Sequence, residues 1–411
     1  TLTKLVDAAD QLGLTVARAP RLTELRATET TPIDVRPIAI EDLLGRELRV
    51  LDRAAMKKFI EDRRVLVTGA GGTIGSELVR QIADLKPSHL IVADNSEFNL
   101  YTIDLELLER WPDVPRSAVL ADVRDERRVN ALFAEERPNV VFHAAALKHV
   151  PMLESHPCEG VLSNVAGTRH IAEACRSHGV EDMVLISTDK AVNPTSVMGA
   201  TKRVAESWCQ ALDLESCTRR SGTRFITVRF GNVLGSTGSV VPLFRRQLAQ
   251  GGPLTVTHPD INRYFMHQRE AVELVLQASA LGAGTHAEGG CIYVLDMGEP
   301  VRIVDLARRM IRLAGLRPDR DIKIVFTGLR PGEKLNEELF HSAEPLKPTS
   351  MTGILLAAPR VADRLFLTKA LDELQTAARS GDTQATLKLL QRLVPEFGEA
   401  DMVKTAESAA R

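Results

Sequence analysis

The amino-acid sequence predicts an α/β protein whose main domain is a doubly wound parallel sheet, with a smaller C-terminal region beside it. Three observations predict this fold. From Arg64 onward, short β-branched runs alternate with longer helical stretches. The short runs are apolar at nearly every position, which is typical of strands covered by helices on both faces. A glycine-rich turn follows the first of these runs directly and opens the first helix.

The elements are expected in the following order along the chain. Strands are expected at Val65–Thr68, His89–Asp94, Ala118–Ala121, Val140–His143, Met183–Ser187 and Phe225–Phe230. Helices are expected between them at Ile74–Leu85, Phe98–Arg110, Glu126–Glu136, Glu159–Ser177 and Ala200–Leu214. After Gly231 the pattern is irregular, until an amphipathic helical stretch at Ala362–Leu393 that is broken at Ser380-Gly381-Asp382.

The composition is that of a globular protein, and it excludes several classes of function. Hydrophobic residues make up 44% and charged residues 26% of the 411 residues, and the formal net charge is −2. No excess of basic residues is present to neutralise a nucleic-acid backbone. With 12 Phe, 3 Tyr and 2 Trp, base-stacking platforms are not expected either. The longest apolar runs, such as Val140–Phe142 and Ala144–Leu147, are far shorter than the roughly 20 residues of a membrane span.

The cysteines give no sign of a metal site or a disulfide framework. Cysteine occurs at five scattered positions, Cys158, Cys175, Cys209, Cys217 and Cys291. They form no CxxC pair and no metal-ligand spacing with the histidines. Such a set is typical of reduced thiols in the cytosol. We therefore expect a cytoplasmic chain without a metal.

The glycine-rich loop between the first strand and the first helix predicts a dinucleotide site. The loop is Thr68-Gly69-Ala70-Gly71-Gly72-Thr73-Ile74-Gly75. Gly69 permits the tight turn, Gly72 lets the backbone approach a pyrophosphate, and Gly75 lets helix and strand pack closely. Thr73 and Ile74 begin the helix, whose free N–H groups face the phosphates.

Three further strand ends complete the expected cofactor site. Asp94 ends the second strand, where a carboxylate accepts from the adenosine ribose diol and repels a 2′-phosphate. The expected cofactor is therefore NAD and not NADP. Asp122-Val123 follows the third strand, where the acid either accepts from the adenine amino group or caps the next helix. Ala144-Ala145 follows the fourth strand and either lies against the nicotinamide ribose or belongs to the core.

The fifth strand ends in Ser187-Thr188-Asp189-Lys190, at the edge where open α/β sheets bind their ligands. Lys202 lies further along, at the end of Met198-Gly199-Ala200-Thr201-Lys202. The chain thus has an MxxxK motif after an acid and a lysine at a strand end.

At these residues the chain resembles an extended short-chain dehydrogenase/reductase, a Rossmann-like fold. In that superfamily the usual motif is YxxxK, with Tyr as acid/base and Lys on the nicotinamide ribose; here Met198 takes the place of the Tyr. Longer stretches resemble the nucleotide-sugar dehydratases of bacterial polysaccharide and glycan biosynthesis. They are HAAALKHVP (His143–Pro151), ISTDKAVNPTSVMGATK (Ile186–Lys202), RFGNVLGSTGSVVPLF (Arg229–Phe244) and LRPGEKLNEEL (Leu329–Leu339). The chain most resembles the large, membrane-associated, configuration-retaining UDP-N-acetylglucosamine 4,6-dehydratases of the PglF/WbpM kind.

The resemblance implies a reaction and a role for each residue. Sugar C4 is oxidised by NAD⁺, the acidified C5 proton is removed, the C6 hydroxyl leaves as water, and hydride returns to C6. Lys190 is implied to be the C5 base, Asp189 the acid at the C6 oxygen, and Thr188 the partner of the C4 oxygen. A lysine base requires a pKa depressed by burial, by Lys202 and by the cationic nicotinamide. Without the Tyr, the acceptor of the C4 hydroxyl proton stays open: a relayed water, or Lys202 through the ribose.

The nucleotide-sugar side is expected in the later motifs. A diphosphate needs cations and a helix N-terminus, and uridine needs polar partners. The candidate residues are Lys148, Asn232, Ser239, Val240, Arg245, Arg263, Arg330 and Glu333, the last as acceptor from the uridine ribose. Each charged residue alone also fits a solvated surface position.

Two other functions compete with the UDP-N-acetylglucosamine 4,6-dehydratase. A 4-epimerase on the same scaffold returns hydride to C4, so it has no need of an Asp189-Lys190 pair beside C5 and C6. A catalytically silent NAD-binding regulator would account for the missing Tyr. The intact Thr188, Asp189, Lys190 and Lys202 argue against that regulator.

The expected organisation has four parts. They are an N-terminal segment and linker (1–60), an NAD-binding domain (61–230, with 268–300 returning to it), a nucleotide-sugar region (231–267 and 301–345) and a C-terminal helical segment (346–411). Because the chain starts at Thr1, we expect a soluble catalytic fragment of a protein anchored in the bacterial inner membrane through a missing N-terminal region. A homo-oligomer is also expected, with no nucleic-acid partner.

Overall fold

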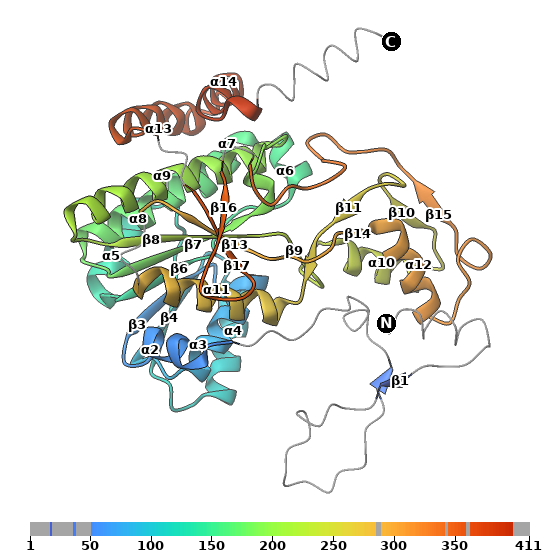
Figure 1. The fold of residues 1–411 in the computed structure, drawn as a ribbon, viewed down its shortest axis with the longest axis horizontal. Helices are drawn as coiled ribbons and strands as arrows, with labels where there is room; N and C mark the ends of the chain where they lie inside the picture. The colour runs from blue at the N-terminus through green and yellow to red at the C-terminus, as the bar shows by residue number, and fades with distance from the viewer. Residues whose placement is uncertain are drawn as a thin grey trace, which may run out of the picture.

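The computed structural model describes residues 17–18, 36–37, 51–284, 289–341, 344–358 and 362–397. Expectations for residues 1–50 lie outside these ranges, apart from β1 (Ala17–Arg18) and β2 (Arg36–Pro37), which pair antiparallel. The described residues form one large sheet covered by helices, with a smaller α/β region at its side (Figure 1). In this part of the chain no helix is both long and apolar enough to cross a bilayer.

The central sheet has nine strands in the order β16-β17-β13-β8-β7-β6-β3-β4-β5. Seven of them run parallel: β3 (Arg64–Thr68), β4 (His89–Asp94), β5 (Arg116–Leu120), β6 (Val140–His143), β7 (Asp182–Thr188), β8 (Arg224–Phe230) and β13 (Ile292–Leu295). The edge pair β17 (Ile354–Ala357) and β16 (Leu346–Pro348) is antiparallel. The predicted doubly wound parallel sheet is confirmed.

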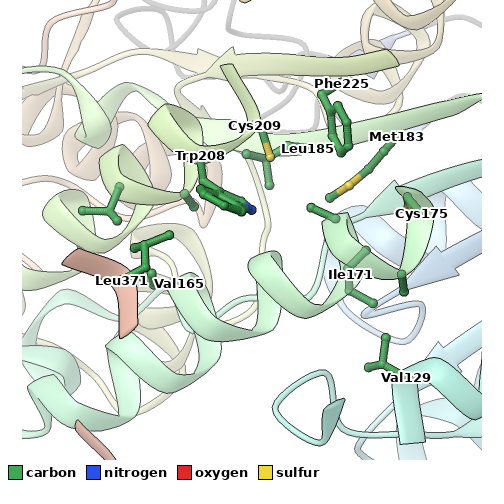
Figure 2. Packing of buried hydrophobic residues seen from close by; sticks show 14 of the residues in the cluster. Val129, Val165, Ile171, Cys175, Met183, Leu185, Trp208, Cys209, Phe225 and Leu371 are labelled. Carbon is green, nitrogen blue, oxygen red and sulfur yellow. The ribbon is translucent and has the colours of Figure 1, made fainter. Parts of the chain in front are cut away.

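Helices cover both faces of the sheet (Figure 1). One face carries α2 (Arg53–Ile60), α3 (Thr73–Asp84), α4 (Glu97–Arg110) and α11 (Gln268–Gly284). The other carries α5 (Glu126–Glu136), α8 (Gly167–Ser177) and α9 (Val197–Arg219). On this second face Trp208 of α9 is packed among buried apolar side chains such as Val165 and Leu371 (Figure 2). The apolar strands thus bury their side chains on both faces, which is the main source of the sheet's stability.

Polar caps explain where several of these helices begin. Ser96 accepts from the Asn99 N–H at the start of α4, and Asp125 accepts from two N–H groups at the start of α5. Ser196 accepts from the Gly199 N–H at the start of α9. Such caps each stabilise a helix by about 1 kcal/mol. Because Asp125 caps α5, the alternative that Asp122 is the cap does not apply.

Two stretches differ from the expected pattern. The single helix expected at Glu159–Ser177 is divided into α7 (Pro157–Gly160), the π-helical turn η2 (Val161–Ala166) and α8. The short helix α6 (Val150–Ser155) precedes them. After Gly231, β13, β16 and β17 join the sheet although the sequence shows no clear strand pattern there. Their three or four residues are too short for a period to be recognised.

The C-terminal helices lie on the outside of the second helical layer. They are α13 (Arg364–Arg379) and α14 (Thr383–Leu393). The expected break at Ser380–Asp382 is confirmed, because Asp382 caps α14 by accepting from the Ala385 N–H. Leu367, Leu371 and Leu390 join the core that α9 also shares.

The smaller region has its own core beside the carboxyl end of the sheet. Its helices are α10 (Val240–Ala249) and α12 (Ile303–Leu313). Its short strands are β9 (Asn232–Val233), β10 (Leu254–Val256), β11 (Asn262–Arg263), β12 (Phe265–Met266), β14 (Val301–Arg302) and β15 (Ile324–Phe326). Phe244, Ile311 and Leu254 lie at the centre of this core. The region therefore supplies a second wall opposite the strand ends.

Candidate active site

The glycine-rich loop leads from β3 into α3 without room for side chains. Gly69 has a φ of +65°, which glycine adopts without strain. A Cβ at Gly75 would collide with the Gly69 carbonyl oxygen. Gly72 is the N-cap of α3 and offers no side-chain cap, and Thr73 and Ile74 form the first turn. The backbone N–H groups at this helix start are thus left for an external acceptor.

The loop borders a cavity of about 210 Å³ at the carboxyl ends of β3, β4, β5 and β6, which we call the loop cavity. Its lining includes seven residues predicted to bind the cofactor: Gly69, Gly72, Asp94, Asp122, Val123, Ala144 and Ala145. A Cβ at Gly69 would lie 2.7 Å from the Cα of Ala145. The Ala144-Ala145 turn therefore packs directly against the glycine loop, and residues from four strand ends meet around one space.

The two acids of this cavity have different partners. Asp94 is 8% exposed, and its Oδ2 and Oδ1 accept from the backbone N–H groups of Gly71 and Ser96, both at 2.9 Å. Asp122 accepts from the Arg124 guanidinium at 2.7 Å. Burial would raise the pKa of Asp122, but the bonds from Arg124 outweigh it and lower that pKa. Both side chains line the cavity, and Asp122 faces it as a carboxylate at neutral pH.

A hydrogen-bonded chain not foreseen from the sequence supports the floor of this cavity. The Thr168 hydroxyl donates to the carbonyl of Asn164 at 2.7 Å, so its oxygen accepts from Nε2 of His143 at 3.1 Å. Nδ1 of His143 then accepts from the Thr68 hydroxyl at 2.8 Å. Burial, together with the charge of Lys202, lowers the pKa of His143 to about 3. The ring is thus a neutral, fixed link between β3, β6 and α8.

Asn164, in the π-helical turn, continues this support toward α9. Its side chain accepts from the Leu147 N–H at 2.8 Å and donates to the Leu147 carbonyl at 3.0 Å. It also donates to the Thr201 hydroxyl at 3.0 Å, which in turn donates to the Met198 carbonyl. A π-turn often marks a functional position. Here it brings one amide to both the turn after β6 and the MxxxK helix.

Thr188, Asp189 and Lys190 stand together at the end of β7, where the 3₁₀ turn η3 (Asp189–Ala191) begins. The Thr188 hydroxyl donates to Oδ1 of Asp189 at 2.9 Å, and Nζ of Lys190 donates to the same oxygen at 3.0 Å. Nζ also donates to Oδ1 of Asn232 at 2.8 Å. Asp189 is fully buried, and its Oδ2 has no hydrogen-bond partner in the described residues. This Asp-Lys pair is not a solvated surface ion pair.

The expected depression of the Lys190 pKa is wrong for this structure. Burial alone would lower that pKa, but the adjacent carboxylates of Asp189 and Glu337 outweigh burial and raise it. Glu337 was not among the predicted residues. Its Oε1 lies 3.6 Å from Nζ of Lys190, and its side chain is 3% exposed. The only sequence signal for Glu337 is its place in the motif Leu329–Leu339.

Lys202 and Met198 lie on the first turns of α9. Nζ of Lys202 donates to the Ile186 carbonyl at 2.7 Å, and burial lowers its pKa to about 8. Met198 is 4% exposed and belongs to the apolar core of that helical layer. The side chain at the position of the usual Tyr is therefore part of the hydrophobic core in this structure.

A buried ionic cluster fixes α9 against the sheet. Glu206, one turn after Lys202, accepts from Arg229 of β8 at 2.8 Å and from the Ser187 hydroxyl at 2.6 Å. Arg229 also donates to Glu344 at 2.9 Å. These side chains are almost fully buried, and removal of one partner of such a pair costs several kcal/mol. The cluster therefore holds the strand end, the helix and the segment before β16 together.

A second cavity, of about 130 Å³, is lined by Lys190, and we call it the lysine cavity. Besides Lys190, its lining includes three predicted substrate residues: Arg263, Arg330 and Glu333. Arg263 donates to the carbonyls of Asn262 and Lys334 at 2.7 and 2.9 Å. It thereby fixes the loop that carries the other two.

The remaining predicted substrate residues are not among those that line either cavity. Ser239 is the N-cap of α10, its Oγ is buried without a hydrogen-bond partner in the described residues, and Val240 is the first residue of that helix. Arg245 lies in the middle of α10 and is not among the residues that line either cavity. Lys148 lies on the exposed turn after β6, and partial desolvation lowers its pKa.

Comparison with known proteins finds one family over most of the described chain. The family described as "Polysaccharide biosynthesis protein" matches residues 65–359. The Capsular polysaccharide biosynthesis protein CapD of Staphylococcus aureus is 46% identical over 333 residues, which are 81% of this chain and 54% of that protein. The chain thus spans little more than half the length of this curated relative.

Two other relatives carry names of defined enzymes. A UDP-N-acetylglucosamine 4,6-dehydratase (inverting) of Campylobacter jejuni is 31% identical over 68% of this chain and 78% of its own length. A UDP-glucose 4-epimerase of Rickettsia rickettsii is 33% identical over 70% of this chain and 80% of its own length. Relatives of similar identity therefore have different enzymatic names.

Solved structures share the fold. Pen from Bacillus thuringiensis is similar with a TM-score of 0.66 and 33% identity, over 74% of this chain and 90% of that one. MoeE5, in complex with UDP-glucose and NAD, is similar with a TM-score of 0.51 and 25% identity, over 66% of this chain and 86% of that one.

Proposed function

The chain belongs to the polysaccharide biosynthesis protein family, and on that premise we propose that it is a nucleotide-sugar 4,6-dehydratase. The proposed substrate is UDP-N-acetylglucosamine, and the product is UDP-2-acetamido-4-keto-2,6-dideoxy-hexose for bacterial polysaccharide or glycan biosynthesis. The name of the Campylobacter jejuni relative supports this substrate.

The observation that carries the proposal is the pair at the end of β7 formed by Asp189, which is fully buried, and Lys190, whose side chain is 21% exposed. Water elimination across C5 and C6 needs a base for the C5 proton and an acid for the C6 oxygen. Asp189 and Lys190 are an acid and an amine whose polar atoms lie 3.0 Å apart. The cavity beside them is lined by further positively charged side chains. A 4-epimerase has no elimination step, and so no use for such a pair.

NAD is the proposed cofactor, and the residues of the loop cavity fit it. Gly69, Gly72 and Gly75 leave the backbone bare at the start of α3, where a pyrophosphate binds. Asp94 would accept from the adenosine ribose, and Asp122 from the adenine amino group. Val123, Ala144 and Ala145 line the same cavity. When bound, NAD would accept the hydride from C4 and return it to C6.

The contact of Thr188 with Asp189 provides a route for the C4 hydroxyl proton in the absence of the usual Tyr. A sugar hydroxyl that donates to Thr188 Oγ1 can lose its proton to Thr188 while Thr188 gives its own proton to Asp189. Asp189 then gives that proton to the C6 hydroxyl, which leaves as water. Because Asp189 and Glu337 raise the pKa of Lys190, the base is the deprotonated fraction of Lys190, which takes the C5 proton and later returns it to C5. All protons are thereby accounted for, and no phenol is required.

The lysine cavity is the proposed place of the nucleotide-sugar. Arg263 and Arg330 supply positive charge for a diphosphate, and Glu333 accepts from the uridine ribose. The N-terminus of α10, at Ser239 and Val240, adds free N–H groups. Asn232 already contacts Lys190, so its side chain is placed to contact a substrate beside the base. Lys148 and Arg245 are proposed as outer charges that attract the substrate.

The test is a product analysis with two substrates. Purified protein with NAD⁺ is incubated with UDP-N-acetylglucosamine or with UDP-glucose, and the products are analysed by mass spectrometry and NMR. We expect a product lighter by one water, with a 4-keto and a 6-methyl group, from UDP-N-acetylglucosamine. A C4 epimer of unchanged mass would establish the epimerase instead. No reaction with either substrate would overturn the proposal.

A further inference from the structure

Glu337 is a buried carboxylate beside Lys190 that the proposed mechanism does not use. Its side chain is 3% exposed, with Oε1 lying 3.6 Å from Nζ of Lys190 and 3.7 Å from Nε of Arg263. Its Oε2 is buried and has no hydrogen-bond partner among the described residues. A buried, partly unsatisfied carboxylate is costly. Such a cost is typical of a functional position.

The surroundings hold Glu337 firmly in this place. It lies in the loop after β15, and Arg263 binds that loop through the carbonyls of Lys334 and Leu335 at 2.9 and 3.2 Å. The Asn262 N–H donates to the Leu335 carbonyl at 3.1 Å as well. The carboxylate is therefore presented to Lys190 by a fixed loop and not by a free side chain on the surface.

The hydrogen-bond acceptors around Lys190 show which carboxylate is left to orient it. Nζ has three donor protons, and three side chains face it: Asp189 at 3.0 Å, Asn232 at 2.8 Å and Glu337 at 3.6 Å. Arg263 repels the ammonium, and Arg330, Glu333 and Lys334 line the lysine cavity as well. Asp189 is assigned to the proton of the C6 hydroxyl, so its charge changes during the reaction. Glu337 is the carboxylate beside Lys190 that takes no part in the proposed proton transfers.

We propose that Glu337 is a positioning residue for Lys190. It orients Nζ toward the lysine cavity and stabilises the ammonium that forms when Lys190 takes a proton from carbon. This corresponds to the role of an acid that orients a catalytic imidazole and stabilises its protonated form. No new bond or proton transfer is added, since Glu337 exchanges no proton in the proposed steps. The inference rests on the proposed base function of Lys190, but its electrostatic part is testable alone.

The first experiment needs no substrate. Reaction of Lys190 with acetic anhydride, followed by mass spectrometry over a series of pH values, measures where this amine loses its proton. Because Glu337 raises the pKa of Lys190, the transition should move to lower pH in Glu337→Gln. Glu337→Asp keeps the charge and should restore most of the wild-type transition. The matched control is Glu338→Gln, because Glu338 is 49% exposed and pairs with Lys334.

The second experiment uses turnover of UDP-N-acetylglucosamine by the same variants. Glu337→Gln should lower kcat by about 10-fold to 100-fold, the usual effect of an orienting partner, and move the acidic limb of the kcat profile to lower pH. KM should change little. An unchanged Lys190 transition in Glu337→Gln would overturn the inference, as would a raised KM with an unchanged pH profile. If wild-type protein has no dehydratase activity, the proposed function fails. The labelling result still shows whether Glu337 acts on the Lys190 ammonium.

Discussion

Oδ2 of Asp94 accepts a hydrogen bond from the backbone N–H of Gly71 at 2.9 Å, so the acid at the end of β4 holds the glycine-rich loop after β3. Its Oδ1 accepts from the Ser96 N–H just before α4. Each oxygen keeps a second acceptor site, and the side chain lines the loop cavity. One carboxylate therefore shapes the loop and faces the place proposed for the adenosine ribose.

We predict that Asp94→Asn weakens the preference for NAD⁺ over NADP⁺ by about 10-fold or more, because a carboxylate repels a 2′-phosphate. Asn keeps one acceptor oxygen, which can retain the contact with the Gly71 N–H, while the charge and the contact with the Ser96 N–H are lost. Dissociation constants of both dinucleotides, measured by calorimetry, check this. Asp104→Asn, at a partly exposed acid of α4 that pairs with Arg116, is the control. Equal affinity of wild-type protein for both dinucleotides would contradict the assignment.

The sequence predicted much of the sheet because its central strands are buried on both faces. The bounds of β4 and β6 agree with the expected ranges, since each is a continuous apolar run. β16 and β17 could not be predicted in the same way. Their place at the antiparallel edge depends on pairing of β17 with β13, far earlier in the chain, and of β16 with β17. The family resemblance to extended short-chain dehydrogenase/reductases is confirmed by the match over residues 65–359.

The candidate site likewise has residues that the sequence predicted and residues that it did not. The glycine loop and the strand ends are local patterns, and topology alone brings them to one edge. Asn164 and Glu337 have no such pattern. Asn164 acts through partners in the turn after β6 and in α9, and Glu337 through a loop that Arg263 binds. Buried polar contacts of this kind depend on tertiary structure, which spacing in the sequence does not encode.

For the acid/base pair we predict that Lys190→Ala and Asp189→Asn each lower kcat by about 100-fold or more, the usual size of a general acid/base contribution. Thr188→Val should have a similar effect, because it removes the hydroxyl that donates to Asp189. Thr188→Ser keeps the hydroxyl and should retain most of the activity. Lys58→Ala, on the exposed surface of α2, is the control. A wild-type rate in Lys190→Ala or in Asp189→Asn would rule out the proposed role of the residue replaced.

Replacement of Met198 by Tyr should not increase activity. Met198 is 4% exposed in a packed apolar core, so the larger phenol must displace neighbours at a cost of about 1–3 kcal/mol. Met198→Leu conserves volume and should cost less than about 1.5 kcal/mol with little effect on turnover. Thermal unfolding and kcat of both variants are measured side by side. A gain in kcat at unchanged stability would show that the fold has kept room for the phenol.

The last prediction concerns stability in acid. The pKa of His143 is about 3 in the folded protein, against 6.5 for an ordinary histidine, because burial and Lys202 disfavour its charged form. The unfolded chain therefore binds more protons at this histidine between these pH values, so the contribution of His143 to the free energy of unfolding falls as pH decreases below 6.5, by up to about 1.4 kcal/mol per pH unit. Above pH 6.5 this contribution is fully present.

Urea unfolding of the wild type, His143→Asn and His178→Asn between pH 7.5 and 5 measures this dependence. His143→Asn removes the contacts with Thr68 and Thr168, so it should be less stable at pH 7.5. It should also lose less stability than the wild type between the two pH values, by about 2 kcal/mol. His178 is exposed at the end of α8, and its variant should follow the wild type. Parallel curves for wild type and His143→Asn would mean that His143 does not stay neutral in the folded protein.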